Sequence, residues 1–286
     1  MHAMDKYEVI GSCIEGSITN PPFKMIFGDL IVQNMLDNLI DESKPDAVIH
    51  CAALANVDQC ERDQDLAFRL NAELPGKLAK LTSKLGLKLV QISTDSVFDG
   101  KTGNYVESDI TNPLNIYAKS KLAGEENVAK NDPDAIIARV NFFGWSMTGQ
   151  RSLAEWFFNN LSDNCHISGF SDVFFNPLEV MSLAKQLLAL IEKDLSGIYH
   201  VASPNFISKY EFGRQIANLF GFDDSLISPQ SWRSAGLSAN RATNATLSIN
   251  KLVNDLGMVP PTVQESLSFW HDSYIHGYPQ KLRSFA

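Results

Sequence analysis

The sequence lacks the marks of a disulfide-bonded or metal-binding protein. Its 286 residues include only four cysteines, with no C-x-x-C pair and no metal-ligand spacing: Cys13, Cys51, Cys60 and Cys165. The histidines are scattered, without the paired spacing that a metal site needs. We therefore expect reduced and mostly buried thiols, a cytoplasmic protein and no bound metal.

A strongly basic patch and a long apolar run are also missing. The formal net charge is −9, the isoelectric point is near 5.1, and no cluster of lysines or arginines stands out. This composition argues against nucleic acid or an anionic membrane surface as a partner. The apolar run around residues 183–191 contains Lys185 and Gln186 and is too short to span a bilayer. Residues 1–4 are not apolar, so we expect no secretory signal.

A glycine-rich turn is the third missing feature. A dinucleotide-binding unit starts with a strand, a G-x-G-x-x-G turn and a helix. No such segment precedes residue 7, and Gly11 and Gly16 do not form this pattern.

What the sequence does contain is an alternation of strands and helices. Apolar runs predict strands at residues 7–12, 24–27, 47–51, 87–93 and 135–140, and the stretches between them predict helices at 33–43, 67–85 and 116–130. We therefore predict an α/β fold, with a doubly wound, Rossmann-like parallel sheet in residues 1–140. Residues 141–286 should form mainly a smaller lobe, with helices at 178–193, 209–220 and 262–275 and a strand at 196–202 that returns to the sheet edge.

The residues that point most directly to chemistry lie in residues 89–121. An apolar strand there ends in Ser93-Thr94-Asp95, and parallel α/β sheets bind ligands at the carboxyl ends of their strands. Tyr117 and Lys121 stand four residues apart in a predicted helix, so their side chains share a face. Such a pair also occurs by chance on many solvated helices. If it is functional, the ammonium would lower the pKa of Tyr117 and make this residue a general acid or base near neutral pH.

This stretch resembles the active-site half of the extended short-chain dehydrogenase/reductases, and within them the dTDP-4-dehydrorhamnose reductase family. The family pattern is S-T-D-Y-V-F-D-G, followed by Y-x-x-x-K and L-x-G-E. The sequence has S-T-D-S-V-F-D-G at residues 93–100, then Tyr117, Lys121 and L-A-G-E at residues 122–125. Ser96 replaces the usual tyrosine, which removes an aromatic ring near the site but no catalytic group.

The resemblance implies an NAD(P)H-dependent oxidoreductase that reduces a 4-keto-6-deoxy nucleotide sugar, as in dTDP-L-rhamnose biosynthesis. It implies that Tyr117 donates the proton, that Lys121 lowers the pKa of Tyr117 and binds the nicotinamide ribose, and that Thr94 bonds the keto oxygen. Asp95 would contact the sugar nucleotide. Two alternatives stay open: a nucleotide-sugar epimerase or dehydratase of the same superfamily, and a non-catalytic regulatory subunit resembling the methionine adenosyltransferase β-subunit. The identity of the sugar and the oligomeric state stay open as well; a homodimer is possible.

By the same resemblance, the cofactor would be NADPH or NADH. Ser12 stands where an acidic residue would bind the adenine ribose, which leaves both cofactors open. The other positions are the adenine pair Asp29 and Leu30, the small-residue turn Ala52, Ala53 and Leu54, and Asn71, which would help to order a proton-relay water. Some of these positions also have a structural interpretation. Small residues such as Ala52 and Ala53 pack well, and Asn71 could be a buried amide that caps a helix or packs between helices.

The resemblance places further substrate-binding residues in the C-terminal half. An ungapped count from Arg139 puts Phe142 where the family stacks an aromatic ring on the substrate, whereas Trp145 is the nearer chemical match. Either ring could instead belong to the core. Arg241 matches an arginine loop that would face the pyrophosphate, which arginine binds through bidentate hydrogen bonds. The family's proline after this arginine is Ala242 here, so the geometry of the loop is open.

In the family, a first strand and a T-G-x-x-G-x-x-G loop precede the strand matched by residues 7–12. Residues 1–6 look like the tail of the helix that follows that loop. By resemblance, we expect these segments to be lacking here through a late start codon or a trimmed chain.

Overall fold

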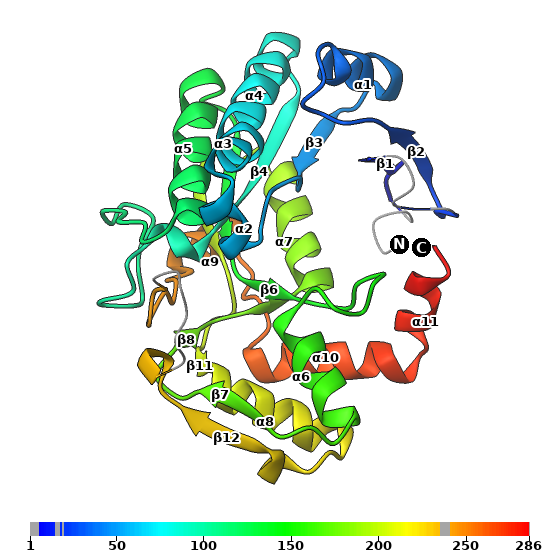
Figure 1. The fold of residues 1–286 in the computed structure, drawn as a ribbon. Helices are drawn as coiled ribbons and strands as arrows, with labels where there is room; N and C mark the ends of the chain where they lie inside the picture. Colours follow the sequence, from blue (N-terminus) through cyan, green and yellow to red (C-terminus); the bar gives the residue numbers. More distant parts are fainter. Residues whose placement is uncertain (1–5, 15–17, 19, 235–240, 286) are drawn as a thin grey trace.

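The computed structural model describes residues 6–14, 18, 20–234 and 241–285. Residues 1–5, predicted as part of a helix tail, and Gly16 lie outside the described residues. The protein folds into a sheet flanked by helices and a C-terminal lobe below it in Figure 1.

Four parallel strands form the main sheet, in the order β10-β5-β4-β3. These strands are β3 (Ala47–His50), β4 (Lys88–Thr94), β5 (Ile136–Val140) and β10 (Gly197–Val201). β5 is buried along its whole length, as its apolar run predicts for a central strand. β10 is the predicted strand at 196–202, and it pairs with β5 at the sheet edge, so that prediction is confirmed.

Helices cover both faces of the sheet, which confirms the predicted doubly wound arrangement (Figure 1). On one face, Leu89 and Ile137 pack against α1, α4 and α5. On the other, Val90 and Ile136 pack against α7 and α9. Successive side chains of a strand point to opposite faces, which explains this division. The bounds of these helices are α1 (Met35–Ser43), α4 (Leu74–Leu85), α5 (Ile116–Asn131), α7 (Val180–Glu192) and α9 (Asn250–Leu256).

A second, two-stranded parallel sheet stands apart from the first. β1 (Ile10–Cys13) pairs only with β2 (Lys24–Phe27), and no described strand pairs with the outer edge of β3. Ile49 of β3 is 37 % exposed, although its sequence predicts a buried strand. The predicted strand at 7–12 was too early, because residues 6 and 7 instead contact Glu192 at the end of α7.

The long helix predicted at residues 67–85 is present and ends at Leu85, but it begins earlier and is not regular throughout. The structure has α3 (Gln64–Phe68), one π-helical turn at Arg69–Glu73 and then α4. Before them lies α2 (Val57–Arg62), which the sequence did not predict. π-helical turns are rare and are frequent at functional sites. This one contains Asn71 and lies where Gly124 of α5 comes closest, because a Cβ on Gly124 would stand 2.1 Å from the Asn71 carbonyl oxygen.

The C-terminal lobe is built around an aromatic core. Trp145 stacks on Trp270 with ring centroids 4.2 Å apart, and Phe143, Phe157 and Phe212 are buried around them. The predicted helices at 178–193, 209–220 and 262–275 are all present, within one or two residues at each end. The elements of the lobe are β6 (Phe142–Phe143), α6 (Leu153–Ser162), β7 (Ile167–Phe170), β8 (Phe174–Phe175), β9 (Leu178–Glu179), β11 (Ile207–Ser208), α8 (Lys209–Phe220), β12 (Ile227–Gln230), α10 (Val263–Ile275) and α11 (Tyr278–Arg283). None of the described helices combines the length and apolar character needed to cross a membrane.

Candidate functional site

The site lies where β4 ends and α5 begins. Thr94 is the last residue of β4 and caps a short 3-10 turn, Asp95–Val97, through a 3.2 Å hydrogen bond from the Ser96 amide to its Oγ1. Asn115 caps α5 by accepting a 2.9 Å hydrogen bond from the Ala118 amide, which places Tyr117 in the first turn of the helix. The strand end and the helix start therefore bring together the residues predicted to be catalytic.

Tyr117 is half-buried and stays protonated over the physiological range. Burial raises the pKa of Tyr117 to about 12; a hydrogen bond with Thr94 lowers it, and the nearby Asp95 and Cys60 raise it further. The prediction that an ammonium lowers this pKa is wrong for the described structure, because burial dominates and Lys121 is not among the groups that shift it. A phenol with so high a pKa is protonated at neutral pH and can therefore act as a proton donor.

Lys121 is almost fully buried, and its Nζ donates a 2.7 Å hydrogen bond to the Ile92 carbonyl oxygen of β4. Burial lowers the pKa of Lys121 to about 8, and the carboxylate of Glu125 opposes this shift. The ammonium is therefore held against the strand beside Thr94. In the part of the chain that the structure describes, Lys121 Nζ makes this one hydrogen bond, so two of its three N–H donors remain for a ligand.

Asp95 lies 5 % exposed beside Thr94 and accepts three hydrogen bonds. They come from Thr94 Oγ1 at 3.1 Å, Ser96 Oγ at 3.2 Å and Asn141 Nδ2 at 2.6 Å. Burial raises the pKa of Asp95, while these hydrogen bonds and the charge of Lys209 lower it. Thr94 has a single hydroxyl proton, which it can donate either to Asp95 or to Tyr117. Ser96, the departure from the family pattern, thus adds a polar contact to Asp95.

The turn after β3 presents small residues to solvent. Ala52 and Ala53 are exposed, and Leu54 is half-buried. Asn71 holds this turn: its Oδ1 accepts from the Leu54 amide at 2.8 Å, and its Nδ2 donates to Leu54 O and to Ser120 Oγ, both at 3.0 Å. Both amide hydrogens are used, so Asn71 ties the turn to α5. The water-ordering role of Asn71 stays a prediction.

The other predicted cofactor residues lie in the separate sheet or next to it. Ser12 is exposed on β1. Asp29 follows β2, and its Oδ1 accepts a 3.1 Å hydrogen bond from the Ile31 amide, which shapes the loop that contains Leu30. Within the described part of the chain, no hydrogen bond or ion pair joins these residues to Thr94, Tyr117 or Lys121, so their cofactor roles also stay predictions.

The two aromatic candidates differ in exposure. Trp145 is 8 % exposed, and its Nε1 donates to Trp270 O and Ser273 Oγ, at 3.1 and 3.0 Å, inside the lobe core. Because Trp145 is buried in the core, it matches the family's substrate-stacking tryptophan in residue type but has no exposed face for a ligand. Phe142 is 48 % exposed at the start of β6, next to Asn141. Phe142 is therefore the aromatic ring with a free face.

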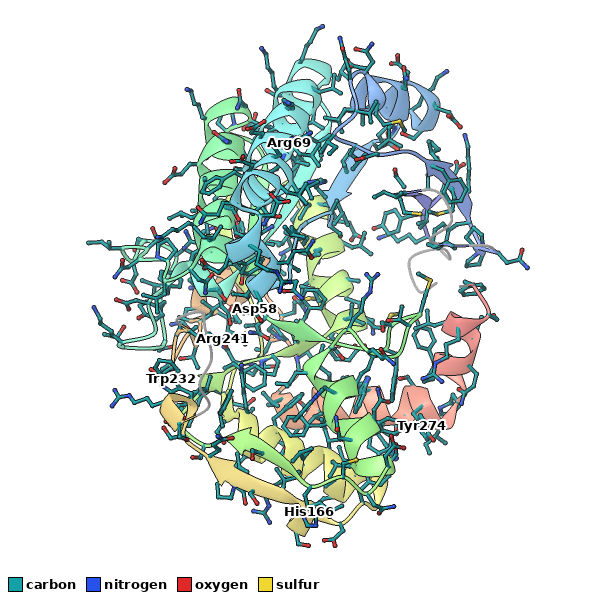
Figure 2. All side chains as sticks on the ribbon, in the orientation of Figure 1. Asp58, Arg69, His166, Trp232, Arg241 and Tyr274 are labelled. Atoms are coloured by element: carbon teal, nitrogen blue, oxygen red, sulfur yellow. The ribbon has the colours of Figure 1, made fainter. Side chains whose placement is uncertain are left out.

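Arg241 lies at the junction of the sheet layer and the C-terminal lobe (Figure 2). It is half-buried, and its Nε is buried without a hydrogen-bond partner among the described residues. Its positive charge, after burial, lowers the pKa of Lys209 at the start of α8, while Asp95 raises it. Arg241 and Asp95 are thus both close enough to Lys209 to shift its pKa.

The loop that follows Arg241 docks on the end of the S-T-D-S-V-F-D-G motif. A Cβ on Gly100 would stand 2.6 Å from Ala242 Cβ and 2.7 Å from the Thr243 nitrogen, so only glycine fits there. The Asn244 amide donates a 3.1 Å hydrogen bond to Gly100 O. Ala242 is therefore compatible with a docked loop.

Comparison with known proteins places the chain in a family. The model of the RmlD substrate binding domain matches residues 19–275. The chain belongs to this family. A probable low-salt glycan biosynthesis reductase of Haloferax volcanii is 32 % identical over 235 residues, 80 % of this chain and 78 % of that protein. Methionine adenosyltransferase 2 subunit beta of Danio rerio is 32 % identical over 231 residues, 78 % of this chain and 71 % of that protein.

The solved structures agree with this assignment. The crystal structure of dTDP-4-dehydrorhamnose reductase from Bacillus anthracis in complex with NADP has a TM-score of 0.83 and 26 % identity, covering 93 % of this chain and 98 % of that one. The predicted family resemblance is confirmed, and so is the fold class. Sequence reasoning missed Lys209, Asn141 and Ser120, because only the fold brings them to Asp95 and Asn71; Ser120 stands at a variable position of the Y-x-x-x-K motif, and the other two stand in no recognisable motif.

Gly124→Ala should lower the free energy of unfolding by about 1–3 kcal/mol. The added Cβ would meet the Asn71 carbonyl at 2.1 Å, and this backbone atom belongs to a buried turn that cannot move alone. Gly76→Ala is the comparison on α4: its Cβ would stand 2.9 Å from Asn127 Cβ, a side-chain atom rather than a backbone carbonyl, so we expect a smaller loss of stability. Urea unfolding measures both; equal stability of the Gly124 variant and wild type would refute the tight packing of α5 on the π-helical turn.

His50 makes the stability depend on pH. Burial lowers the pKa of His50 to about 4, helped by Lys121, and its Nε2 has no hydrogen-bond partner among the described residues. In the unfolded chain His50 binds a proton near pH 6.5, whereas in the folded protein it stays neutral down to about pH 4. The free energy of unfolding therefore falls by about 3 kcal/mol as the pH drops through this window. His50→Gln should flatten this slope in urea unfolding between pH 7 and 4, whereas exposed His166→Gln should not. An unchanged slope in the His50 variant would contradict the assignment.

Proposed function

We propose that the protein reduces a 4-keto-6-deoxy nucleotide sugar, such as dTDP-4-dehydrorhamnose, with NADPH or NADH. The observation that carries the proposal is the convergence of Thr94, Tyr117 and Lys121 at the carboxyl end of β4, in a chain of the RmlD substrate binding domain family. The similarity to a dTDP-4-dehydrorhamnose reductase in complex with NADP supports both the reaction and the cofactor.

The residues around Tyr117 fit the nicotinamide half of such a cofactor. Ala52 and Ala53 are small and exposed, so a ligand can approach the backbone there. The free N–H donors of Lys121 would hold the ribose hydroxyls. When bound, the cofactor supplies the hydride that adds to the keto carbon.

Tyr117 then supplies the proton. Its raised pKa of about 12 keeps the phenol protonated at neutral pH, and the alkoxide that forms on the sugar is the stronger base and takes that proton. Thr94 stabilises the same oxygen by donating its hydroxyl proton, once Asp95 releases it.

The substrate diphosphate would lie against Arg241 and Lys209. A dianionic group bound between these two cations would relieve their mutual repulsion. The Arg241 Nε, which has no hydrogen-bond partner among the described residues, is available as a donor. Phe142, the exposed aromatic ring, would stack on the base or the sugar.

The test of this function is NADPH oxidation with the nucleotide sugar, followed by absorbance and by identification of the sugar product. We expect a dTDP-linked 4-keto-6-deoxy sugar to be reduced at C4, with Thr94→Val as an inactive comparison. A product epimerised or dehydrated without net oxidation of NADPH would instead indicate the epimerase or dehydratase alternative.

A non-catalytic regulatory subunit is the second candidate, since methionine adenosyltransferase 2 subunit beta of Danio rerio is 32 % identical to this chain. The retained Thr94, Tyr117 and Lys121 favour catalysis. The alternative predicts no keto-sugar reduction and a stoichiometric complex with a methionine adenosyltransferase catalytic subunit, measured by sedimentation of the two purified proteins.

A further inference from the structure

The L-A-G-E motif of α5 has no part in the proton transfer described above, yet its glutamate is among the most buried charges of the site. Glu125 is 3 % exposed and stands one helical turn after Lys121. Burying a carboxylate is unfavourable unless it is paired and hydrogen-bonded, so its partners reveal what holds it there.

Glu125 joins three elements. Arg139 of β5 donates from Nη2 to Oε2 at 2.8 Å and from Nε to both carboxylate oxygens at 3.1 Å. Ser93 of β4 donates to Oε1 at 2.5 Å. The carboxylate therefore links α5, which contains Tyr117 and Lys121, to the strand end that contains Thr94.

Arg139 is itself held on its far side. Its Nη1 donates to Glu107 O at 3.4 Å and faces His200 Nε2 at 3.5 Å, and its guanidinium lies 5.1 Å from the Phe98 ring centre. Burial, then the charge of Arg139, lowers the pKa of His200 to about 4. His200 is therefore neutral and does not repel the Arg139 guanidinium, while the Glu107 carboxylate on this side accepts a 3.1 Å hydrogen bond from the His200 amide.

We propose that Glu125, clamped by Arg139 and Ser93, is a positioning residue that keeps the Lys121 ammonium charged and the Thr94 hydroxyl in place beside Tyr117. The proposal rests on the proposed reductase function for its kinetic consequences, whereas its electrostatic half concerns the free protein alone. Ser93 and Thr94 are neighbours on one strand, so a hydrogen bond that pins Ser93 also sets the direction of Thr94.

The groups that face Lys121 make Glu125 its principal anionic neighbour. From α5, the Glu125 carboxylate raises the pKa of Lys121 against the effect of burial. On β3, His50 is neutral with a pKa of about 4. In the turn after β3, burial raises the pKa of the Cys51 thiol, so this thiol is uncharged at neutral pH. Glu125 is the larger of the two groups that raise the pKa of Lys121 against burial, and the other, Cys51, is a thiol rather than a carboxylate.

The first test is Glu125→Gln, with exposed Glu126→Gln as the matched control on the same helix. NMR titration of lysine side chains labelled with carbon-13 follows Lys121 in the free protein, and Lys121→Met assigns its signal. We expect the Lys121 midpoint to fall by about one pH unit or more in the Glu125 variant and to stay unchanged in the control. An unmoved midpoint in a folded Glu125 variant would overturn the electrostatic half.

The second test uses Ser93→Ala, which keeps the Glu125–Arg139 pair and removes one hydrogen bond. We expect an unchanged Lys121 midpoint and a kcat lower by about fivefold, since Thr94 loses its anchor. An unchanged kcat would overturn the positioning half, whether or not the Glu125 variant folds. The alkaline limb of the kcat/KM profile should move to lower pH in the Glu125 variant alone. If wild type reduces no keto sugar, the proposed function fails, and the NMR titration still decides the role of Glu125.

Discussion

Tyr117→Phe should lower kcat by about 10²–10⁴ while leaving the affinity for NADPH unchanged. The substitution removes one oxygen atom and no part of the packing. Tyr117 is the residue of the site with a transferable proton and a pKa of about 12, so without it the proton must come from water. Stopped-flow or steady-state NADPH oxidation, compared with wild type at the same millimolar NADPH, measures the loss.

Tyr210→Phe is the matched control for this variant. Tyr210 is half-buried in α8, and its hydroxyl makes none of the hydrogen bonds described for the site. It should keep wild-type turnover. If the Tyr117 variant also kept turnover, the proton donor would have to be another group, and Asp95, whose pKa burial raises, would be the next to replace.

NADPH should bind this chain more weakly than the micromolar range. Dinucleotide diphosphates are held by backbone amides of a glycine-rich turn at a helix N-terminus, and the described residues contain no such turn. Each hydrogen bond to a charged group contributes roughly 1.5–3 kcal/mol, so two or three fewer give about 3–9 kcal/mol less, against roughly 8 kcal/mol for micromolar binding.

Fluorescence titration of NADPH against the 286-residue chain measures this affinity. Nicotinamide mononucleotide, which lacks the adenosine half, is a useful comparison. The two ligands should bind with similar affinity if no backbone amides of the chain hold the diphosphate. Micromolar binding of NADPH, with much weaker binding of the mononucleotide, would show that another segment of the chain performs the task of the glycine turn.

The alternation of apolar runs was sufficient to predict the four strands of the main sheet and the flanking helices α1, α4, α5 and α7, but not α9, which also covers the sheet. Strands such as β5 are buried on both faces and so appear as continuous apolar stretches, which local pattern detects. The π-helical turn at Asn71 could not be predicted, because it depends on contact between two helices distant in the sequence. The short strands of the lobe, such as β6 and β9, were missed because two residues show no periodicity.

In the candidate site, too, the features set by local sequence could be predicted and those set by tertiary contacts could not. Thr94, Tyr117 and Lys121 follow from spacing on one strand end and one helix, so the sequence sufficed to place them together. The direction of the Tyr117 pKa shift did not follow, since it depends on burial by residues from several elements. Lys209 was missed for the same reason: its neighbours Asp95 and Arg241 are more than thirty residues away on either side, and tertiary folding alone joins them.

The open outer edge of β3 gives the two halves of the site different rigidity. The catalytic half, on β4, β5 and α5, is enclosed by buried contacts, which open at a higher free energy than an edge strand does. The turn at residues 52–54 follows a strand paired on one side, and such edges open locally at low free energy. A ligand that needs the closed turn binds with an affinity reduced by the fraction of closed molecules. Affinity and turnover can therefore vary independently in this fold, the first with the population of one turn and the second with a preorganised proton donor.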